Sequence, residues 1–177
     1  MFEPNTVYAK IAYDAILLYL KTGKKLFKKE EEIPPALKLN LACYVSIYSG
    51  NSLKSCLGDP EPRHPQLYNE IIENAVQAAF ENPDSEPLKE EELNNISITV
   101  DVLSEPKPVK DLSLIKPRKH GILVKDEKGN QSVLLPKSNG IDTADKQINA
   151  LRESGGIDPD TPLDALKVYN FTTTKYQ

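Results

Sequence analysis

Apolar residues near the start of the chain follow a helical spacing. Between residues 6 and 20 they recur every three or four positions, the period of one face of an α-helix. These positions are Val7, Ile11, Ala15 and Leu18, with Ile16 and Leu20 widening the stripe. Thr6 suits the N-cap and Gly23 suits the C-terminal stop. We therefore predict a helix over 6–20 with Thr6 as its cap.

Two further helices are predicted from similar patterns. One follows Pro65, a residue favoured in the first helical turn, and runs to about Phe80, before Asn82-Pro83. Its inward stripe is expected to be Tyr68, Ile72, Ala75, Val76 and Ala79, and its outward residues Glu70, Glu73 and Gln77. The other is predicted from Asp142, as its cap, to about Ser154, with Gly155-Gly156 as the stop.

Strand patterns occupy much of the remaining chain. Segments 41–48 and 53–57 flank Ser49-Gly50-Asn51-Ser52, and segments 121–124 and 132–135 flank a turn at 126–130. Residues 96–103 alternate as in a half-buried strand, and residues 168–176 predict a terminal strand. Because hairpins require antiparallel pairing, we predict an α+β fold, with a mainly antiparallel sheet flanked by helices.

The first hairpin decides the surroundings of Cys56. Counting from the turn places Cys56 opposite Val45 and Lys54 opposite Ile47. One face would then carry Cys43, Val45, Ile47, Lys54 and Cys56. A nearby lysine favours a reactive thiolate. Apolar neighbours favour a packed, protonated thiol instead, and we expect this second state for Cys56.

Composition narrows the class of protein. The 177 residues fit one compact domain, and 39% hydrophobic residues can build a core without disulfides or metals. Lys and Arg total 22 against 26 acidic residues, so no nucleic-acid binding is expected. The run from Ala15 to Leu20 is too short to cross a bilayer, and the first five residues lack a signal-peptide pattern. We therefore expect a cytoplasmic protein with both cysteines reduced and no membrane association.

A charged segment follows the first predicted helix. It contains Lys24, Lys25, Lys28 and Lys29, and then Glu30, Glu31 and Glu32. Because the basic and acidic blocks cancel in charge, we interpret the segment as a solvated linker rather than a binding patch.

Several pieces of the sequence resemble the AMMECR family, named after the Alport syndrome, mental retardation, midface hypoplasia and elliptocytosis chromosomal region. They are Lys54-Ser55-Cys56-Leu57-Gly58, Ile72-Glu73-Asn74-Ala75, Asn82-Pro83, Pro87-Leu88, Glu91-Glu92-Leu93, 98–103, Lys119-His120-Gly121-Ile122, Leu134-Leu135-Pro136 and Val168-Tyr169-Asn170-Phe171. The resemblance implies a single AMMECR-type domain over 1–177, with a larger α+β part and a smaller lobe. The family has no established reaction.

Two departures from the family pattern affect its expected binding groups. Lys54-Ser55 stands where the family has Arg-Gly, which keeps a charge but loses the planar guanidinium fork. Asn82-Pro83-Asp84-Ser85 stands where the family tends to have Asp-Pro-Arg-Phe. The resemblance still marks candidate binding residues, namely Lys54, Ser55, Gly58, Glu73 and Asn74.

The candidate catalytic residues are Cys56 as nucleophile and His120 as base. His120 could equally anchor a turn by bonding a carbonyl group, and we favour that structural role. The two cysteines and two histidines lack the spacing of a metal site, and no Gly-rich phosphate loop is present. We expect neither a metal nor a cofactor.

Two functions from different classes follow. In the first, which we favour, the protein is an accessory, partner-binding module. The resemblance to the AmmeMemoRadiSam system protein A implies Memo-type and radical-SAM-type partners. In the second, it is a small-molecule enzyme or ligand-binding protein that uses Cys56 and His120, with Lys54 steering an anionic group. The sequence leaves open the oligomeric state and whether any reaction is catalysed.

Overall fold

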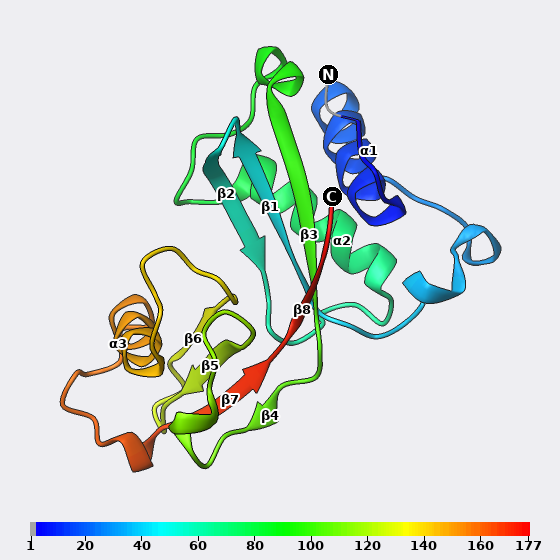
Figure 1. Ribbon diagram of the computed structural model, residues 1–177. Coiled ribbons are helices and arrows are strands. Elements are labelled where there is room, and N and C mark those ends of the chain that lie inside the picture. The colour runs from blue at the N-terminus through cyan, green and yellow to red at the C-terminus, as the bar shows by residue number, and fades with distance from the viewer. Residues whose placement is uncertain (1–2) are drawn as a thin grey trace. The chain divides into compact units, whose positions relative to one another are not determined.

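The computed structural model describes residues 3–177, which divide into two compact units. The larger unit holds the chain up to Val102 together with Thr174–Gln177, and the smaller unit holds Leu103–Thr173. Each unit has its own buried apolar core. The described residues form three α-helices and two four-stranded antiparallel sheets, which confirms the predicted α+β class (Figure 1). Among these residues, no helix has the length and hydropathy that a membrane span requires.

Helix α1 (Val7–Thr22) begins and ends as its sequence predicts. The Thr6 hydroxyl accepts a hydrogen bond from the Ala9 backbone N–H at 3.3 Å, and Gly23 ends the helix with a φ of 67°. Val7, the first member of the predicted apolar stripe, is 48% exposed, whereas Ile11 and Ala15 of that stripe are buried. Ala12, fully buried, follows Val7 by five positions, so the two point to nearly opposite sides of the helix.

Helix α2 (Leu67–Val76) continues into a π-helical turn, η3 (Gln77–Glu81), and ends at Asn82. Its predicted apolar stripe is buried. Glu70, expected to face solvent, is also fully buried. Its carboxylate accepts hydrogen bonds from the backbone N–H groups of Arg63 and His64, both at 3.0 Å. The buried charge therefore serves to fix the loop that precedes the helix.

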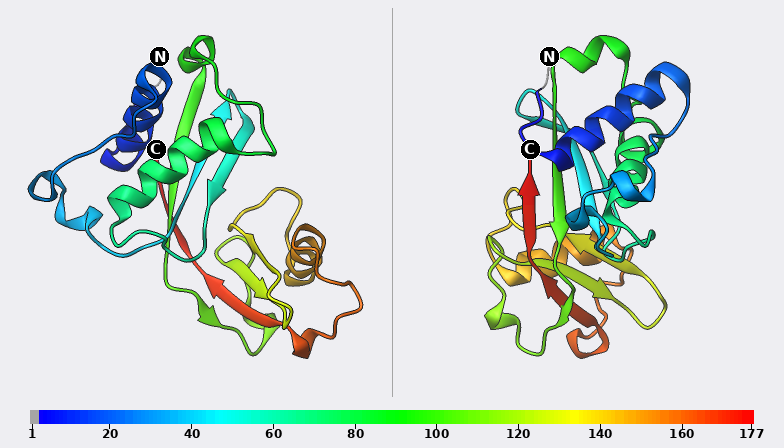
Figure 2. Two further views of the ribbon diagram at one scale, coloured as in Figure 1. Left: turned by 180° about the vertical axis from the view of Figure 1, so that it is seen from behind. Right: turned by 90° about the vertical axis from the view of Figure 1, so that its right-hand side faces the viewer.

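The sheet of the larger unit has the strand order β2-β1-β3-β8. Its strands are β1 (Cys43–Ser49), β2 (Ser52–Gly58), β3 (Ile96–Leu103) and β8 (Thr173–Tyr176). Both α1 and α2 lie on one side of this sheet (Figure 2), and the core there includes Val45, Ile47, Ile98 and Val100. Thr99 and Asp101 alternate with these residues and are also buried. Strand β3 is thus buried on both faces, not on one as its alternating pattern indicated.

A β-bulge shifts the register of the β1–β2 hairpin. Tyr48 pairs with Leu53, but the next residue of β1, Ile47, pairs with Ser55. Lys54 is therefore an extra residue in β2. Because side chains alternate along a strand, one extra residue exchanges the two faces for every residue that follows it.

The bulge makes the predicted surroundings of Cys56 wrong. The turn lies at Gly50 and Asn51 as expected, but Cys56 pairs with Ser46, and Val45 pairs with Leu57. Cys56 consequently shares the polar side of the sheet with Ser46, away from Val45.

The sheet of the smaller unit has the strand order β4-β7-β5-β6. Its strands are β4 (Lys107–Pro108), β5 (Gly121–Lys125), β6 (Gln131–Leu134) and β7 (Lys167–Phe171). Helix α3 (Ala144–Ser154) contributes Ile148 and Leu151 to the core of this unit. Its cap is Thr143, whose hydroxyl accepts from the Lys146 N–H at 3.2 Å, rather than Asp142. The predicted terminal strand divides at Thr172 into β7 and β8, which belong to different sheets.

Short helical turns connect these elements. They are η1 (Glu30–Glu32), η2 (Pro35–Leu37), η4 (Glu90–Asn94), η5 (Leu112–Leu114) and η6 (Leu163–Ala165).

Candidate functional site

Cys56 is half-buried on the polar side of the larger unit's sheet. Its Sγ accepts a hydrogen bond from the Ser46 hydroxyl at 3.2 Å. Burial raises the pKa of the Cys56 thiol; the Ser46 hydrogen bond and the Lys175 charge oppose this rise, and Asp101 adds to it. A raised pKa keeps the thiol protonated near neutral pH, which disfavours a thiolate nucleophile.

The cation expected to activate Cys56 makes a different interaction. Lys54 Nζ forms an ion pair with Glu92 Oε1 at 2.5 Å, and this hydrogen bond lowers the pKa of Glu92. The lysine whose charge acts on Cys56 is Lys175, which also pairs with Asp101 Oδ2 at 3.0 Å. Lys175 is far from Cys56 in sequence, so only the placement of β8 beside β3 reveals this neighbour.

Ser55 and Gly58 pack the first hairpin against its surroundings. Ser55 is buried, and its Oγ accepts a hydrogen bond from Asn82 Nδ2 at 2.8 Å. A Cβ atom at Gly58 would collide with the backbone of Cys43 and Tyr44. Glycine is therefore required at this position for close backbone approach.

Glu73 and Asn74 connect α2 to other segments of the larger unit. Asn74 is fully buried; its amide donates to the Cys43 carbonyl at 2.9 Å, and its Oδ1 accepts from Arg63. Glu73 forms an ion pair with Lys25 at 2.5 Å. Both of these candidate binding residues therefore have structural partners within the unit.

His120 lies in the smaller unit, immediately before β5, whereas Cys56 lies in the larger unit. Its Nδ1 accepts a hydrogen bond from the Lys116 backbone N–H at 3.1 Å. The ring does anchor a turn, by accepting from an amide rather than by bonding a carbonyl. Because Nδ1 is the acceptor, the neutral ring carries its proton on Nε2, which is then a donor and not a base. The pairing of His120 with Cys56 stays a prediction.

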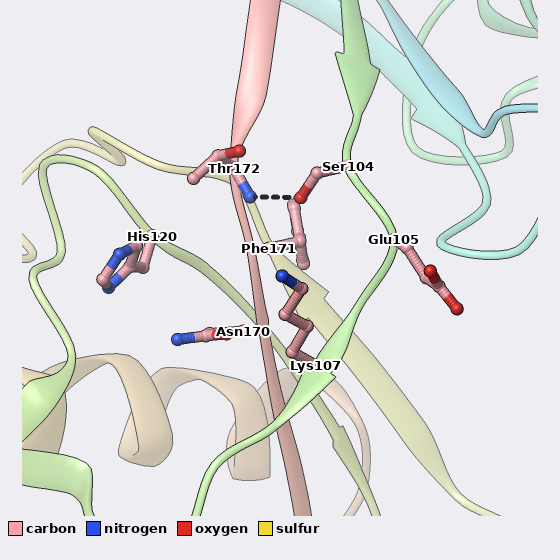
Figure 3. Close-up of a pocket in the computed structure, with 7 residues that line it drawn as sticks. All are labelled: Ser104, Glu105, Lys107, His120, Asn170, Phe171 and Thr172. Carbon is pink, nitrogen blue, oxygen red and sulfur yellow. Dashed lines mark hydrogen bonds between the residues drawn. The ribbon is translucent and has the colours of Figure 1, made fainter.

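A surface hollow of about 480 Å³ lies within the smaller unit and includes His120 in its wall (Figure 3). The lining residues are Ser104, Glu105, Lys107, His120, Asn170, Phe171 and Thr172. The Thr172 backbone N–H donates to Ser104 Oγ at 3.0 Å, and the Ser104 N–H donates to the Thr172 carbonyl at 2.9 Å. These two bonds fix one part of the wall.

Sequence reasoning identified only His120 among these lining residues. Strand register explains why Lys107 and Asn170 are neighbours: Lys107 pairs with Asn170 on one side of β7, and Ile122 pairs with Asn170 on the other. Asn170 belongs to a segment that resembles the family pattern, but nothing in that pattern connects it with Lys107. Within residues 3–177, no group of three or more His, Cys, Asp or Glu side chains could hold a metal ion.

The chain is similar to several known proteins. The AMMECR1 family model matches residues 9–176. A protein of Thermotoga maritima is 35% identical over 173 residues, which cover 96% of this chain and 97% of that protein. Protein CA_C1420 of Clostridium acetobutylicum is 31% identical over 156 residues, which cover 85% of this chain and 32% of that protein. The crystal structure of the uncharacterized protein PH0010 from Pyrococcus horikoshii superposes with a TM-score of 0.86 at 28% identity, covering 95% of this chain and 88% of that one.

Proposed function

The chain belongs to the AMMECR1 family, and we propose that it acts as a non-catalytic accessory module that docks a partner protein. The observation that carries this proposal is the exposure of Phe27, whose side chain is 79% accessible. Aromatic side chains are enriched in protein interfaces and frequently supply most of the binding energy. Phe27 is therefore the expected anchor of the docking surface.

The two residues that precede Phe27 are both in contact with the rest of the larger unit. Leu26 packs against the core of the larger unit. Lys25 forms its ion pair with Glu73 of α2 at 2.5 Å. With its neighbours anchored in this way, Phe27 loses little conformational freedom when a partner covers it.

Three exposed lysines accompany Phe27, namely Lys24, Lys28 and Lys29. No described carboxylate forms an ion pair with any of them. We call Lys24, Phe27, Lys28 and Lys29 the Phe27 patch. Its charge and aromatic group suit a partner surface with an apolar pocket surrounded by acidic residues.

Two residues of the acidic block that follows make contacts of their own. Glu30 pairs with Lys38 at 3.4 Å, and Glu32 accepts a hydrogen bond from the Lys29 backbone N–H at 3.0 Å. Glu30 is therefore paired with a lysine outside the Phe27 patch, whereas Glu32 lies against the backbone of Lys29.

The proposed partners are Memo-type and radical-SAM-type proteins, the classes that the family resemblance implies. The relative from Clostridium acetobutylicum supports a modular role, because the matching segment makes up 32% of that longer protein. A domain that recurs as part of a longer chain is suited to work beside other domains.

The test measures direct binding between purified proteins. The full chain is immobilised, and Memo-type and radical-SAM-type proteins from the same genome are passed over it separately. We expect saturable binding of at least one class, weakened at least tenfold by Phe27→Ser. Leu114→Ser is the matched control, since Leu114 is 66% exposed in the smaller unit. Absence of binding by both classes, or an equal loss of binding in both variants, would overturn the proposal.

Charge is tested separately on the same Phe27 patch. Replacing Lys24 and Lys28 by Glu should slow association and reduce its dependence on salt, because opposite charges steer the encounter. Unchanged association rates would contradict the acidic character proposed for the partner.

The enzyme remains the second candidate, and one observation favours it. Ser46, Asp101 and Lys175 place a hydroxyl, a carboxylate and an ammonium group around the Cys56 thiol. The raised pKa of Cys56 opposes this candidate, because it leaves little thiolate at neutral pH.

A further inference from the structure

We propose that the hollow of the smaller unit binds a small oxyanion, a carboxylate or phosphate group, through Lys107, His120 and Asn170. This site is separate from the Phe27 patch, and neither proposal depends on the other. The inference rests on strand register, on the hydrogen-bond donors that line the hollow and on the contacts that fix its wall.

Strand register brings Lys107 and Asn170 together, and the start of β5 adds His120. Lys107 and Asn170 are direct partners in the β4–β7 pair, so their side chains are neighbours on the same face. Asn170 also pairs with Ile122 of β5. His120 lies immediately before β5 and lines the same hollow as Lys107 and Asn170. In Figure 3 the side-chain amide of Asn170 extends toward His120.

All three residues line the hollow and carry hydrogen-bond donors. The Lys107 ammonium has no ion pair with any described carboxylate. The His120 ring has Nδ1 occupied by the Lys116 N–H, which leaves its proton on Nε2. The Asn170 amide adds two further N–H groups. A positive charge with several N–H donors matches an oxyanion, which can accept from all of them.

The one carboxylate in the lining does not oppose this arrangement. Glu105 points away from Lys107, His120 and Asn170 in Figure 3. A ligand between the three donors would therefore meet the lysine charge rather than the carboxylate.

The wall is ordered before any ligand arrives. His120 is held at both ends, because its carbonyl accepts from Gln147 Nε2 at 3.0 Å and its ring accepts from Lys116. Ser104 and Thr172 are joined by their two hydrogen bonds. A prearranged wall reduces the ordering cost of binding. The volume of about 480 Å³ suits a small molecule carrying such a group.

The experiment is a titration of the full chain followed by two-dimensional amide NMR. Sodium phosphate and sodium acetate serve as probes of the two anion types, with sodium chloride at matched ionic strength as the control. We expect saturable shifts at Ser104, Lys107, His120 and Asn170, with a Kd on the order of 1 mM because the hollow is open to solvent. Saturation by phosphate alone, by acetate alone or by both supports the site and identifies the preferred group. Shifts that do not saturate, or that chloride reproduces, would overturn it.

Variants distinguish binding of the anion at this site from nonspecific attraction of anions to positive charge. Lys107→Gln should weaken binding of the saturating anion at least tenfold. Asn170→Asp should abolish this binding, because its carboxylate repels the anion. Lys119→Gln is the matched control, because Lys119 is exposed beside His120 but does not line the hollow. Lys107 is exposed, so its variant should retain the native spectrum. Equal weakening by Lys107→Gln and Lys119→Gln would show unspecific binding and would contradict the proposal.

Discussion

The hydroxyl group of Ser46 donates a hydrogen bond to Sγ of Cys56 at 3.2 Å, directly across the β1–β2 ladder. This relationship exists because Lys54 is an extra residue in β2, which turns Cys56 to the polar side of the sheet. A thiol in that position is hydrogen-bonded and half-buried. It is therefore a poor nucleophile at neutral pH, although its neighbours are not the apolar residues expected from the sequence.

The first prediction concerns the reactivity of this thiol. Iodoacetamide should modify Cys56 slowly at pH 7, because burial raises its pKa and leaves little thiolate. The rate should keep rising beyond about pH 9 rather than level off near neutrality. Brief labelling of the native protein followed by mass spectrometry measures both.

Two variants serve as controls for this prediction. Lys54→Ala should leave the rate unchanged, since Lys54 pairs with Glu92 instead. Ser46→Ala should slow labelling further, because it removes a hydrogen bond that lowers the pKa of Cys56. Rapid modification of Cys56 at pH 7 that depends on Lys54 would place the enzyme hypothesis first.

A second prediction concerns Asn74. Asn74→Ala should lower the free energy of unfolding by about 1–3 kcal/mol, because the Cys43 carbonyl loses its buried donor. Asn69→Ala is the control on the same helix, where the side chain is half-buried and a change of about 0.5 kcal/mol or less is expected. Urea denaturation with unchanged m-values gives both numbers. Equal stability of the two variants would refute the structural role of Asn74.

A third prediction concerns pH and the pair formed by Lys54 and Glu92. The folded-state pKa of Glu92 is lowered, so the pair stabilises the protein above the unfolded pKa of about 4.3. Its contribution is lost as the pH falls through the lower, folded pKa. Lys54→Met should therefore cost up to about 1 kcal/mol at pH 7 and progressively less toward about pH 3. Urea denaturation of both proteins across this range checks the trend; a difference that grows on acidification would contradict it.

A fourth prediction concerns Gly58. Gly58→Ala should destabilise the larger unit by about 1–3 kcal/mol, since its Cβ would overlap the backbone of Cys43 and Tyr44. Gly50→Asn should be far milder, because no atom lies within 4 Å and Asn tolerates the φ of 57°. Thermal unfolding measures the melting temperatures of the two variants. A lower melting temperature for Gly50→Asn than for Gly58→Ala would contradict this prediction.

The sequence by itself determined the features that depend on neighbouring residues. Thr6 and Gly23 delimit α1 through contacts within a few positions, and Gly50-Asn51 forms the predicted turn through its own backbone preferences. The hairpins in turn indicated antiparallel pairing and the α+β class. The order of similar pieces along the chain was enough to indicate the AMMECR family.

The tertiary structure alone decided which side chains meet. One extra residue, Lys54, exchanged the two faces of β2, and no local pattern marks the position of such a bulge. Lys175 acts on Cys56, and Lys107 lies beside Asn170, because distant strands pair. Strand pairing is set by the packing of whole sheets, so the composition of both candidate sites depends on contacts that no local stretch of sequence encodes.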